Sequence, residues 1–313
     1  MKHLLLAATA AASLVLPIAA SEPAQIPSPG EIAEAAPATD WIAIAPSDLL
    51  VMDLAPDAKG EPRRVVIQLV PAPFSQGWTG NIRKLAAAHW WDGTNINRVQ
   101  DNYVVQWGDA TEKKALPEGL VTVPETEYVV SRADAAGWSA ARAMRTSAPI
   151  IPDPYASSQA LLGWPVGRGK DGELWPIHCY GAVGVGRNMS PDTGSGAELY
   201  AVIGHAPRHL DRNIAVVGRV ISGIEHLSSL PRGTEALGFY KTEAERAAIA
   251  SIRIASELPS AEQPKFEYLS TESDSFARYA DARANRRDPF FIVPAGGADI
   301  CNIPVPVRPV AAK

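Results

Sequence analysis

Arg98 and Gln106 are polar side chains inside two apolar segments that follow each other closely. Segments 96–99 and 103–107 are rich in β-branched and aromatic residues, so each is expected to be a strand. Because strand side chains alternate between faces, Gln106 shares a face with Val104. A guanidinium is always charged and offers a rigid fork of donors, and a Gln amide can bind a backbone carbonyl. The pair is a candidate polar site, although an isolated Arg would more simply form a surface ion pair.

Other spacings in the sequence do not fit catalytic or metal chemistry. His205 and His209 are four residues apart, but they fall in an expected loop without an evident carboxylate partner. Cys179 and Cys301 form no Cys-x-x-Cys pair and do not stand beside a His at a ligand spacing. The glycines of 181–186 are not followed by Gly-Lys-Ser/Thr, so they do not indicate a nucleotide loop. The sequence therefore predicts neither a metal nor a cofactor.

The first twenty residues predict a secretory signal. A short basic start precedes the apolar stretch 4–18, and small residues stand before Ser21. A transmembrane anchor is the alternative, but this stretch is shorter than the roughly 20 residues needed to cross a bilayer. We therefore expect residues 1–20 to be removed, leaving a periplasmic or secreted protein without a membrane span.

The charge of the chain argues against nucleic acid as a partner. The 313 residues include 29 Lys and Arg and 34 Asp and Glu, a formal net charge of -5 at pH 7. No basic stripe is available to neutralise phosphates. The length allows one large domain, or one medium domain with extensions.

The two cysteines are a disulfide candidate. In an oxidising compartment an even pair can be bonded, and Cys179 and Cys301 are the only cysteines. Closing the loop between them would contribute on the order of 4 to 5 kcal/mol in the chain-entropy model. Two small buried thiols are the alternative.

Short apolar runs bounded by turns predict a mainly β fold. Strands are expected at 49–54, 65–70, 96–99, 103–107, 180–185, 198–203, 215–220 and 290–293. Helices are expected at 80–89, 133–144, 224–230, 242–257 and 271–286. Because strands and helices do not alternate regularly, an antiparallel barrel is favoured over a doubly wound parallel sheet.

Composition divides the rest of the chain into three parts. Residues 21–45 are rich in Pro, Ala and Glu and are expected to form a flexible leader without chemistry. Residues 46–235 hold the barrel, interrupted at about 111–177 by a proline-punctuated insertion without a periodic segment long enough to pack alone. Residues 236–313 are expected to be a helical extension packed on the barrel.

Two blocks of sequence resemble the cyclophilin family of peptidyl-prolyl isomerases. In the first, Trp-Asp-Gly-Thr at 91–94 leads to Arg98, and Tyr-Val-Val-Gln-Trp-Gly-Asp follows at 103–109. In the second, Ser-Pro-Asp-Thr-Gly-Ser-Gly-Ala-Glu-Leu-Tyr at 190–200 is similar to the family's Gly-Pro-Asn-Thr-Asn-Gly-Ser-Gln-Phe-Phe stretch. Leu-Asp at 210–211 and the later Val-Gly-Arg-Val run also have counterparts in the family. The insertion and the tail lie outside the resemblance.

The resemblance implies a closed, eight-stranded antiparallel β-barrel with two capping helices. It also implies cis-trans isomerisation of X-Pro bonds in proline-containing polypeptides, without a cofactor, and a role in folding exported proteins. Arg98 and Gln106 would be the catalytic residues. The substrate-binding residues would be Tyr103, Val104, Asn188, Glu198, Tyr200, His209, Leu210 and Ile214. An ideal strand would send Tyr103 and Val104 to opposite faces, so a twist or bulge is needed for both to line one pocket.

Several positions depart from the family pattern. Glu198 stands where the family usually has Gln, and its carboxylate could pair with Arg98 and compete with substrate. His209 replaces a common Trp, and Ile214 falls at the usual pocket His. These departures favour the main alternative, a catalytically weak or inactive peptide-binding or chaperone module. An unrelated exported hydrolase or sugar-binding β-sandwich would be favoured if Arg98 and Gln106 lay far apart.

Overall fold

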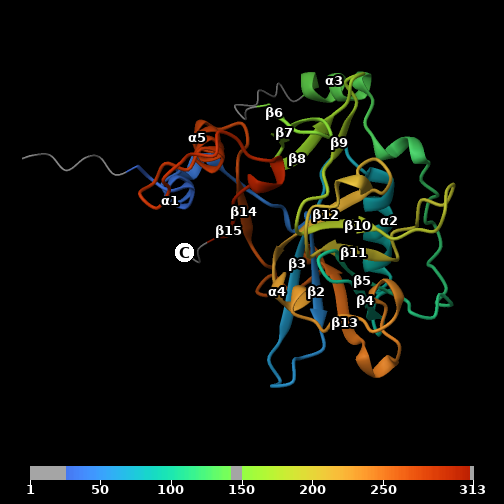
Figure 1. The fold of residues 1–313 in the computed structure, drawn as a ribbon. Coiled ribbons are helices and arrows are strands. Elements are labelled where there is room, and N and C mark those ends of the chain that lie inside the picture. The colour runs from blue at the N-terminus through green and yellow to red at the C-terminus, as the bar shows by residue number, and fades with distance from the viewer. Residues whose placement is uncertain (1–25, 142–149, 311–313) are drawn as a thin grey trace, which may run out of the picture.

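The computed structural model describes residues 26–141 and 150–310, so the expected signal at 1–20 lies outside the described residues. A closed antiparallel barrel of eight strands forms the centre of the molecule (Figure 1), and the predicted fold class is confirmed. Around the barrel the strands follow the order β10, β11, β5, β4, β13, β2, β3, β12. Their bounds are β2 Leu49–Leu54, β3 Arg63–Leu69, β4 Asn95–Val99, β5 Val104–Gly108, β10 Ala182–Val185, β11 Leu199–Val202, β12 Val216–Ser222 and β13 Ala247–Ile254.

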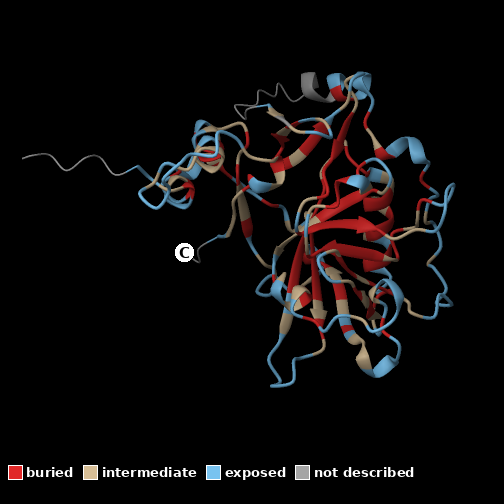
Figure 2. Ribbon diagram, in the orientation of Figure 1, coloured by how far each residue is buried: buried red, intermediate tan, exposed pale blue. Residues whose placement is uncertain are grey.

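The interior of the barrel is apolar because one face of each strand points inward. Met52, Ile67 and Trp107 belong to this buried cluster, and Figure 2 shows the barrel strands as largely buried. Two helices cap it, as predicted: α2 (Gln76–Ala87) adds Leu85 to the cluster, and α4 (Glu225–Ser228) adds Leu227.

A bulge in β4 decides which side chains of this strand face outward. Ile96 pairs with Trp107 and Arg98 pairs with Gln106, so the register shifts between Ile96 and Arg98. Without the extra residue, Arg98 would share the inward face of Ile96. The bulge lets Ile96 and Val99 both enter the core while Arg98 faces outward. The buried Asn97 amide supports this geometry by donating to the Gly108 carbonyl across the pair, at 3.1 Å.

The centre of the segment 242–257 is a barrel strand, β13 (Ala247–Ile254), with a short 3₁₀ segment on each side, so the predicted helix there is wrong. β13 pairs with β2 on one side and β4 on the other. Its Ala and Glu content favours a helix locally, but the open edges of β2 and β4 require a strand between them. Ile252 and Ile254 then alternate into the core. The barrel therefore extends to Ile254 and does not end at 235.

The N-terminal segment from residue 26 onward is folded, so the prediction of a flexible leader is wrong for 26–45. Helix α1 (Pro29–Glu34) begins with a capping box between Ser28 and Glu31. It packs against α5 (Asp274–Ala284), and β1 (Trp41–Ala43) pairs with β14 (Phe266–Leu269). The sequence of this segment showed no core of its own, because the elements it packs against, α5 and β14, lie near the C-terminal end of the chain. Residues 21–25 lie outside the described part.

The C-terminal extension contains the predicted helix near 271–286, observed as α5. Strand β15 (Val307–Pro309) completes a three-stranded sheet with β14 and β1. This sheet packs on the outside of the barrel, since Phe266 shares an apolar cluster with Val51 and Val66. The strand predicted at 290–293 is wrong: none of the strands in the described ranges pairs with this segment, and Phe290 and Ile292 are 84% and 97% exposed.

The insertion lies between β5 and β10 as expected, but it forms a small sheet of its own. Its strands are β6 (Ile151–Pro152), β7 (Ser157–Leu161), β8 (Trp164–Arg168) and β9 (Leu174–Pro176), in that order. Helix α3 (Arg132–Ala141) covers the described part of the helix predicted at 133–144. Trp164 and Val166 pack with Val70 and Phe74, which follow β3. The insertion therefore depends on barrel-side residues for its core.

A disulfide joins Cys179, just before β10, to Cys301 in the extension, across 122 positions of sequence.

Short 3₁₀ segments in the described residues are Ala38–Asp40, Pro46–Asp48, Glu125–Tyr128, Arg208–Leu210, Ala236–Gly238, Glu243–Glu245, Ala255–Glu257 and Ile300–Asn302. Within the described ranges, every helix is too short or too polar to cross a bilayer.

The bulge predicts a specific effect of Asn97→Ala. Loss of the donor to the Gly108 carbonyl should lower the free energy of unfolding by about 1 to 2 kcal/mol. It should also lower activity, because Arg98 is less firmly held outward. Chemical denaturation and a prolyl-peptide assay would measure both effects, with Asn95→Ala in the same strand as the control. Equal stability of the two variants would contradict the role assigned to Asn97.

Candidate active site

A cavity of about 120 Å³ opens on the outer wall of the barrel. It is formed by β4, β5 and β11 together with the loops that follow β10 and β11. Its lining consists of Arg98, Tyr103, Val104, Gln106, Gly186, Arg187, Tyr200, Leu210 and Ile214. The structure therefore brings together all the predicted site residues except Asn188, Glu198 and His209. Sequence reasoning missed Gly186 and Arg187, which stand in the same turn as Asn188.

The guanidinium of Arg98 is held at the edge of this cavity by three acceptors. Its Nε donates to the Leu237 carbonyl at 2.7 Å, and Nη1 donates to Oε1 of Gln106 at 3.2 Å. Nη2 also donates to the side chain of Gln100. This contact removes the condition that would have favoured a β-sandwich protein, and the closed barrel excludes that fold.

Two aromatic rings flank the Arg98 guanidinium. Its central carbon lies 5.7 Å from the ring centroid of Tyr103 and 5.4 Å from that of Phe239. Burial lowers the pKa of Arg98, and the neighbouring Tyr103 opposes this shift. Phe239 was not predicted because it lies beyond residue 235, in a segment assigned to the extension. A β-bridge between Arg98 and Phe239 brings it to the site.

Tyr103 and Val104 both line the cavity although they are neighbours in sequence. Strand β5 begins only at Val104, so Tyr103 belongs to the preceding turn, where Asn102 has a φ of 50°. Strand alternation therefore does not apply to Tyr103. The twist or bulge expected to bring Tyr103 and Val104 into one pocket is therefore a turn just before β5.

Glu198 lies behind Gln106 and does not line the cavity. Burial raises its pKa to about 7, and a hydrogen bond from Gln106 opposes the shift. The ion pairs of the described residues do not include one between Glu198 and Arg98. The expected direct pairing is therefore wrong, because the Gln106 amide lies between them, bonded to Arg98 through Oε1. Gln106 therefore connects the two groups by contacts to both of them.

Asn188 and His209 are exposed residues at the periphery of the cavity. The His209 ring stacks on Tyr103 with centroids 6.1 Å apart, so it buttresses a lining residue. The backbone N–H of Asn188 donates to Asp192, and its carbonyl accepts from Arg187. Arg187 also donates to the Asn213 carbonyl, which fixes a second guanidinium in the lining.

Comparison with known proteins agrees with this architecture. The family model for cyclophilin type peptidyl-prolyl cis-trans isomerase/CLD matches residues 64–256. A solved cyclophilin from Hirschia baltica has a TM-score of 0.63 and 21% identity, covering 87% of this chain and 94% of that one. A cyclophilin type isomerase from Cryptosporidium parvum, crystallised in the presence of the dipeptide Ala-Pro, has a TM-score of 0.37 and 12% identity, covering 65% and 98%. No curated protein matches the chain.

The closed eight-stranded barrel is the fold of a cyclophilin-like protein, and on its outer wall this chain places an arginine beside a cavity lined by both polar and apolar residues. Because the family model spans more than half of the sequence, the chain belongs to the cyclophilin-type peptidyl-prolyl cis-trans isomerase family. The predicted family and enzyme class are confirmed.

The raised pKa of Glu198 predicts a pH dependence of activity. Below about pH 7 the carboxyl is neutral, and above it the negative charge acts on Arg98 through Gln106. The value of kcat/KM for a prolyl peptide should therefore fall by about threefold between pH 6 and pH 8. Glu198→Gln should abolish this fall, whereas Glu118→Gln at an exposed position should keep it. A fall retained in Glu198→Gln would contradict the assignment.

The same shift predicts how stability changes with pH. The pKa of Glu198 in the folded state lies above its ordinary value of 4.5, so the folded state binds more protons than the unfolded state between pH 4.5 and about 7. The contribution of this group to stability therefore declines as pH rises through that window. Glu198→Gln should raise Tm more at pH 8 than at pH 5, measured by calorimetry. An equal change in Tm at both pH values would argue against the raised pKa.

Proposed function

We propose that this enzyme isomerises X-Pro bonds of exported polypeptides outside the cytoplasm, with Arg98 and Gln106 acting on the twisted amide. The observation that carries the proposal is the Arg98 guanidinium, oriented by three acceptors at the edge of a cavity that an apolar cluster lines on one side. The site of action is supported by the secretory signal predicted for residues 1–20 and by two cysteines that pair.

The reaction requires a group that favours the twisted amide over both planar forms. Rotation breaks amide resonance, and the barrier is about 18 to 20 kcal/mol, so the uncatalysed exchange takes tens to hundreds of seconds. In the twisted state the prolyl nitrogen becomes pyramidal and regains a lone pair. A fixed donor beside this nitrogen therefore stabilises the transition state more than either ground state.

Arg98 has the donors that this step needs. A guanidinium carries five N–H groups. Three of them are used by Leu237, Gln106 and Gln100, so two remain among the described contacts. The three acceptors and the two flanking rings fix the orientation of the guanidinium before substrate binds. Stabilisation of the transition state then requires little reorganisation.

The apolar lining provides a place for the proline ring. Val104 and Tyr200 belong to one apolar cluster on the outer face of the barrel, and Tyr103, Leu210 and Ile214 pack against it. A pyrrolidine ring bound here would have its nitrogen near Arg98. Gln106 would then bind a backbone carbonyl of the substrate, as its place beside Arg98 allows.

Glu198 favours a second candidate function, a peptide-binding module with weak catalysis. Above about pH 7 the Glu198 carboxylate is ionised and accepts a hydrogen bond from the Gln106 amide. Its negative charge then partly offsets the positive charge of Arg98, which is bonded to the same Gln106. Peptide would still bind in the apolar cavity, but the guanidinium would stabilise the twisted amide less. Saturable binding of a prolyl peptide without faster exchange would support this alternative.

Arg98→Ala should lower kcat/KM for a prolyl peptide by about 10² to 10³, the usual cost of removing one donor aimed at a transition state. Arg98→Lys should recover only part of the loss, because an ammonium lacks the rigid fork. Arg187→Ala is the matched comparison: it removes a guanidinium from the same lining whose donors go to Asn188 and Asn213 carbonyls. NMR exchange spectroscopy measures the rates. Equal losses for Arg98→Ala and Arg187→Ala would overturn the assigned mechanism.

A further inference from the structure

The floor of the candidate proline pocket is a tyrosine whose hydroxyl is buried. Tyr200 is only 4% exposed, and its hydroxyl lies 2.9 Å from Nε2 of His178. Burial raises the pKa of Tyr200 well above its ordinary value, so the hydroxyl remains protonated. The end of the ring lies over Gly184, where an added Cβ would come within 2.3 Å of the hydroxyl oxygen. The ring is therefore confined on one side by backbone and on another by His178.

His178 is itself fixed by Asp211. The His178 side chain is fully buried, and its Nδ1 lies 2.9 Å from Oδ1 of Asp211, which also accepts the His178 backbone N–H at 3.0 Å. Burial alone would raise the pKa of Asp211, but hydrogen bonds from His178 and Arg208 outweigh it and hold the pKa low. An ionised carboxylate only accepts hydrogen bonds, so Nδ1 carries a proton. In the neutral imidazole Nε2 is then the acceptor for the Tyr200 hydroxyl.

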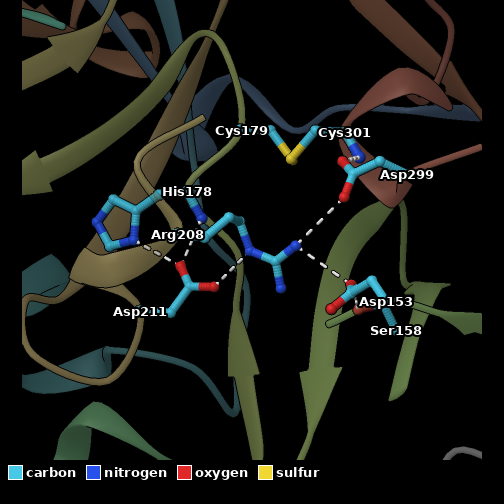
Figure 3. The surroundings of a disulfide bond; sticks show 8 residues. All are labelled: Asp153, Ser158, His178, Cys179, Arg208, Asp211, Asp299 and Cys301. Atoms are coloured by element: carbon cyan, nitrogen blue, oxygen red, sulfur yellow. Dashed lines mark hydrogen bonds and ion pairs between the residues drawn. A yellow bond between two sulfur atoms is a disulfide. The ribbon is translucent and has the colours of Figure 1, made fainter. Parts of the chain in front are cut away.

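Arg208 extends this chain of contacts to two other parts of the molecule. Its buried guanidinium donates from Nε to Oδ2 of Asp211 at 2.8 Å and from Nη1 to Asp153 at 3.2 Å (Figure 3). Asp299 lies 3.5 Å from the same Nη1. Asp153 belongs to the insertion and Asp299 to the C-terminal extension. A single buried cation thus links the barrel, the insertion and the extension.

The disulfide joins the two ends of this network. Cys179 follows His178 directly, and Cys301 donates its backbone N–H to Oδ1 of Asp299 at 2.8 Å. Figure 3 shows the Cys179–Cys301 bond beside the cluster of Arg208 with its three carboxylates. The covalent link keeps the residue that contacts Tyr200 close to the segment that supplies Asp299.

We propose that His178 is a positioning residue of the isomerase site: it holds the Tyr200 ring as the floor of the proline pocket, and Asp211 and Arg208 hold His178 with carboxylates from the insertion and the extension. This inference rests on the proposed function, because it assigns the pocket to a proline ring. It gives the two segments outside the family resemblance a role in the site. A floor that moved would leave the prolyl nitrogen at varying distances from Arg98.

Two substitutions of His178 separate positioning from simple packing. His178→Asn keeps a donor near the Nδ1 position, toward Asp211, but ends short of Tyr200. His178→Gln reaches farther, toward the Nε2 position. His178→Asn should lower kcat/KM for an Ala-Pro tetrapeptide by about tenfold, mainly through a higher KM, because the buried hydroxyl loses its partner. His178→Gln should recover much of that loss, and His205→Asn, at an exposed loop position, should cause none.

A double-mutant cycle with Tyr200→Phe tests whether His178 acts through the hydroxyl. The kcat/KM of Tyr200→Phe is the reference for the second background, and adding His178→Asn to that variant should lower kcat/KM little further. A tenfold loss in both backgrounds, or equal losses for His178→Asn and His178→Gln, would overturn the proposal. Thermal unfolding of each variant identifies losses caused by partial unfolding at the assay temperature.

Nitrogen-15 NMR of the imidazole gives a readout independent of catalysis. In the wild type, Nδ1 of His178 should carry the proton and Nε2 should not, and Tyr200→Phe should shift the Nε2 resonance. A protonated Nε2 would overturn the proposed hydrogen bond. Asp153→Asn should lower kcat/KM by about threefold, because Arg208 loses part of its ion pairing with the insertion. An unchanged kcat/KM would show that the insertion does not help to position His178.

Peptide binding distinguishes failure of this inference from failure of the proposed function. If the wild type binds the Ala-Pro tetrapeptide without accelerating exchange, the catalytic function fails. The Kd of His178→Asn should still rise about tenfold if His178 positions the pocket floor. An unchanged Kd together with normal catalysis in the wild type would refute the positioning role alone.

Discussion

The active site depends on a one-residue bulge that turns Arg98 to the outside of the barrel. In a regular β4, Arg98 would share the inward face of Ile96 and its charge would enter an apolar core. Burying an unpaired guanidinium there would cost several kcal/mol. The bulge at Asn97 avoids this cost and sets Arg98 opposite Gln106. The geometry of the candidate site and the packing of the core therefore arise from the same local feature.

The outward position of Arg98 is stabilised by a segment far along the chain. Leu237 and Phe239 reach Arg98 because the strand that follows them, β13, fills the gap between β4 and β2. Barrel closure and orientation of the guanidinium are thus linked. This linkage explains why the chain beyond residue 235 belongs to the site as well as to the fold.

A cluster of buried charges is connected to the pocket through His178, which contacts both Asp211 and the hydroxyl of Tyr200. Arg208 and Asp211 are both nearly inaccessible, and removing either partner of such a pair is strongly destabilising. Their hydrogen bonds to His178 and Asp153 satisfy most of the charges and give the cluster one defined arrangement. A defined arrangement suits the floor of a binding pocket better than an apolar contact that can repack.

Local sequence patterns predicted seven of the eight barrel strands and most of the residues around the cavity, and the family resemblance implied the two capping helices. Apolar alternation in these seven strands and the Arg98 and Gln106 segments needs no distant partner to be recognised, whereas the pattern at 242–257 favoured the wrong element. The tertiary structure alone decided the strand at 247–254, the folded leader and the contacts of Phe239 and His178. Each depends on a partner distant in sequence: β13 on open strand edges, α1 on α5, and His178 on the hydroxyl of Tyr200. Local propensity favours a helix in an Ala-rich and Glu-rich segment, and only the barrel's need for hydrogen-bond partners overrides that preference.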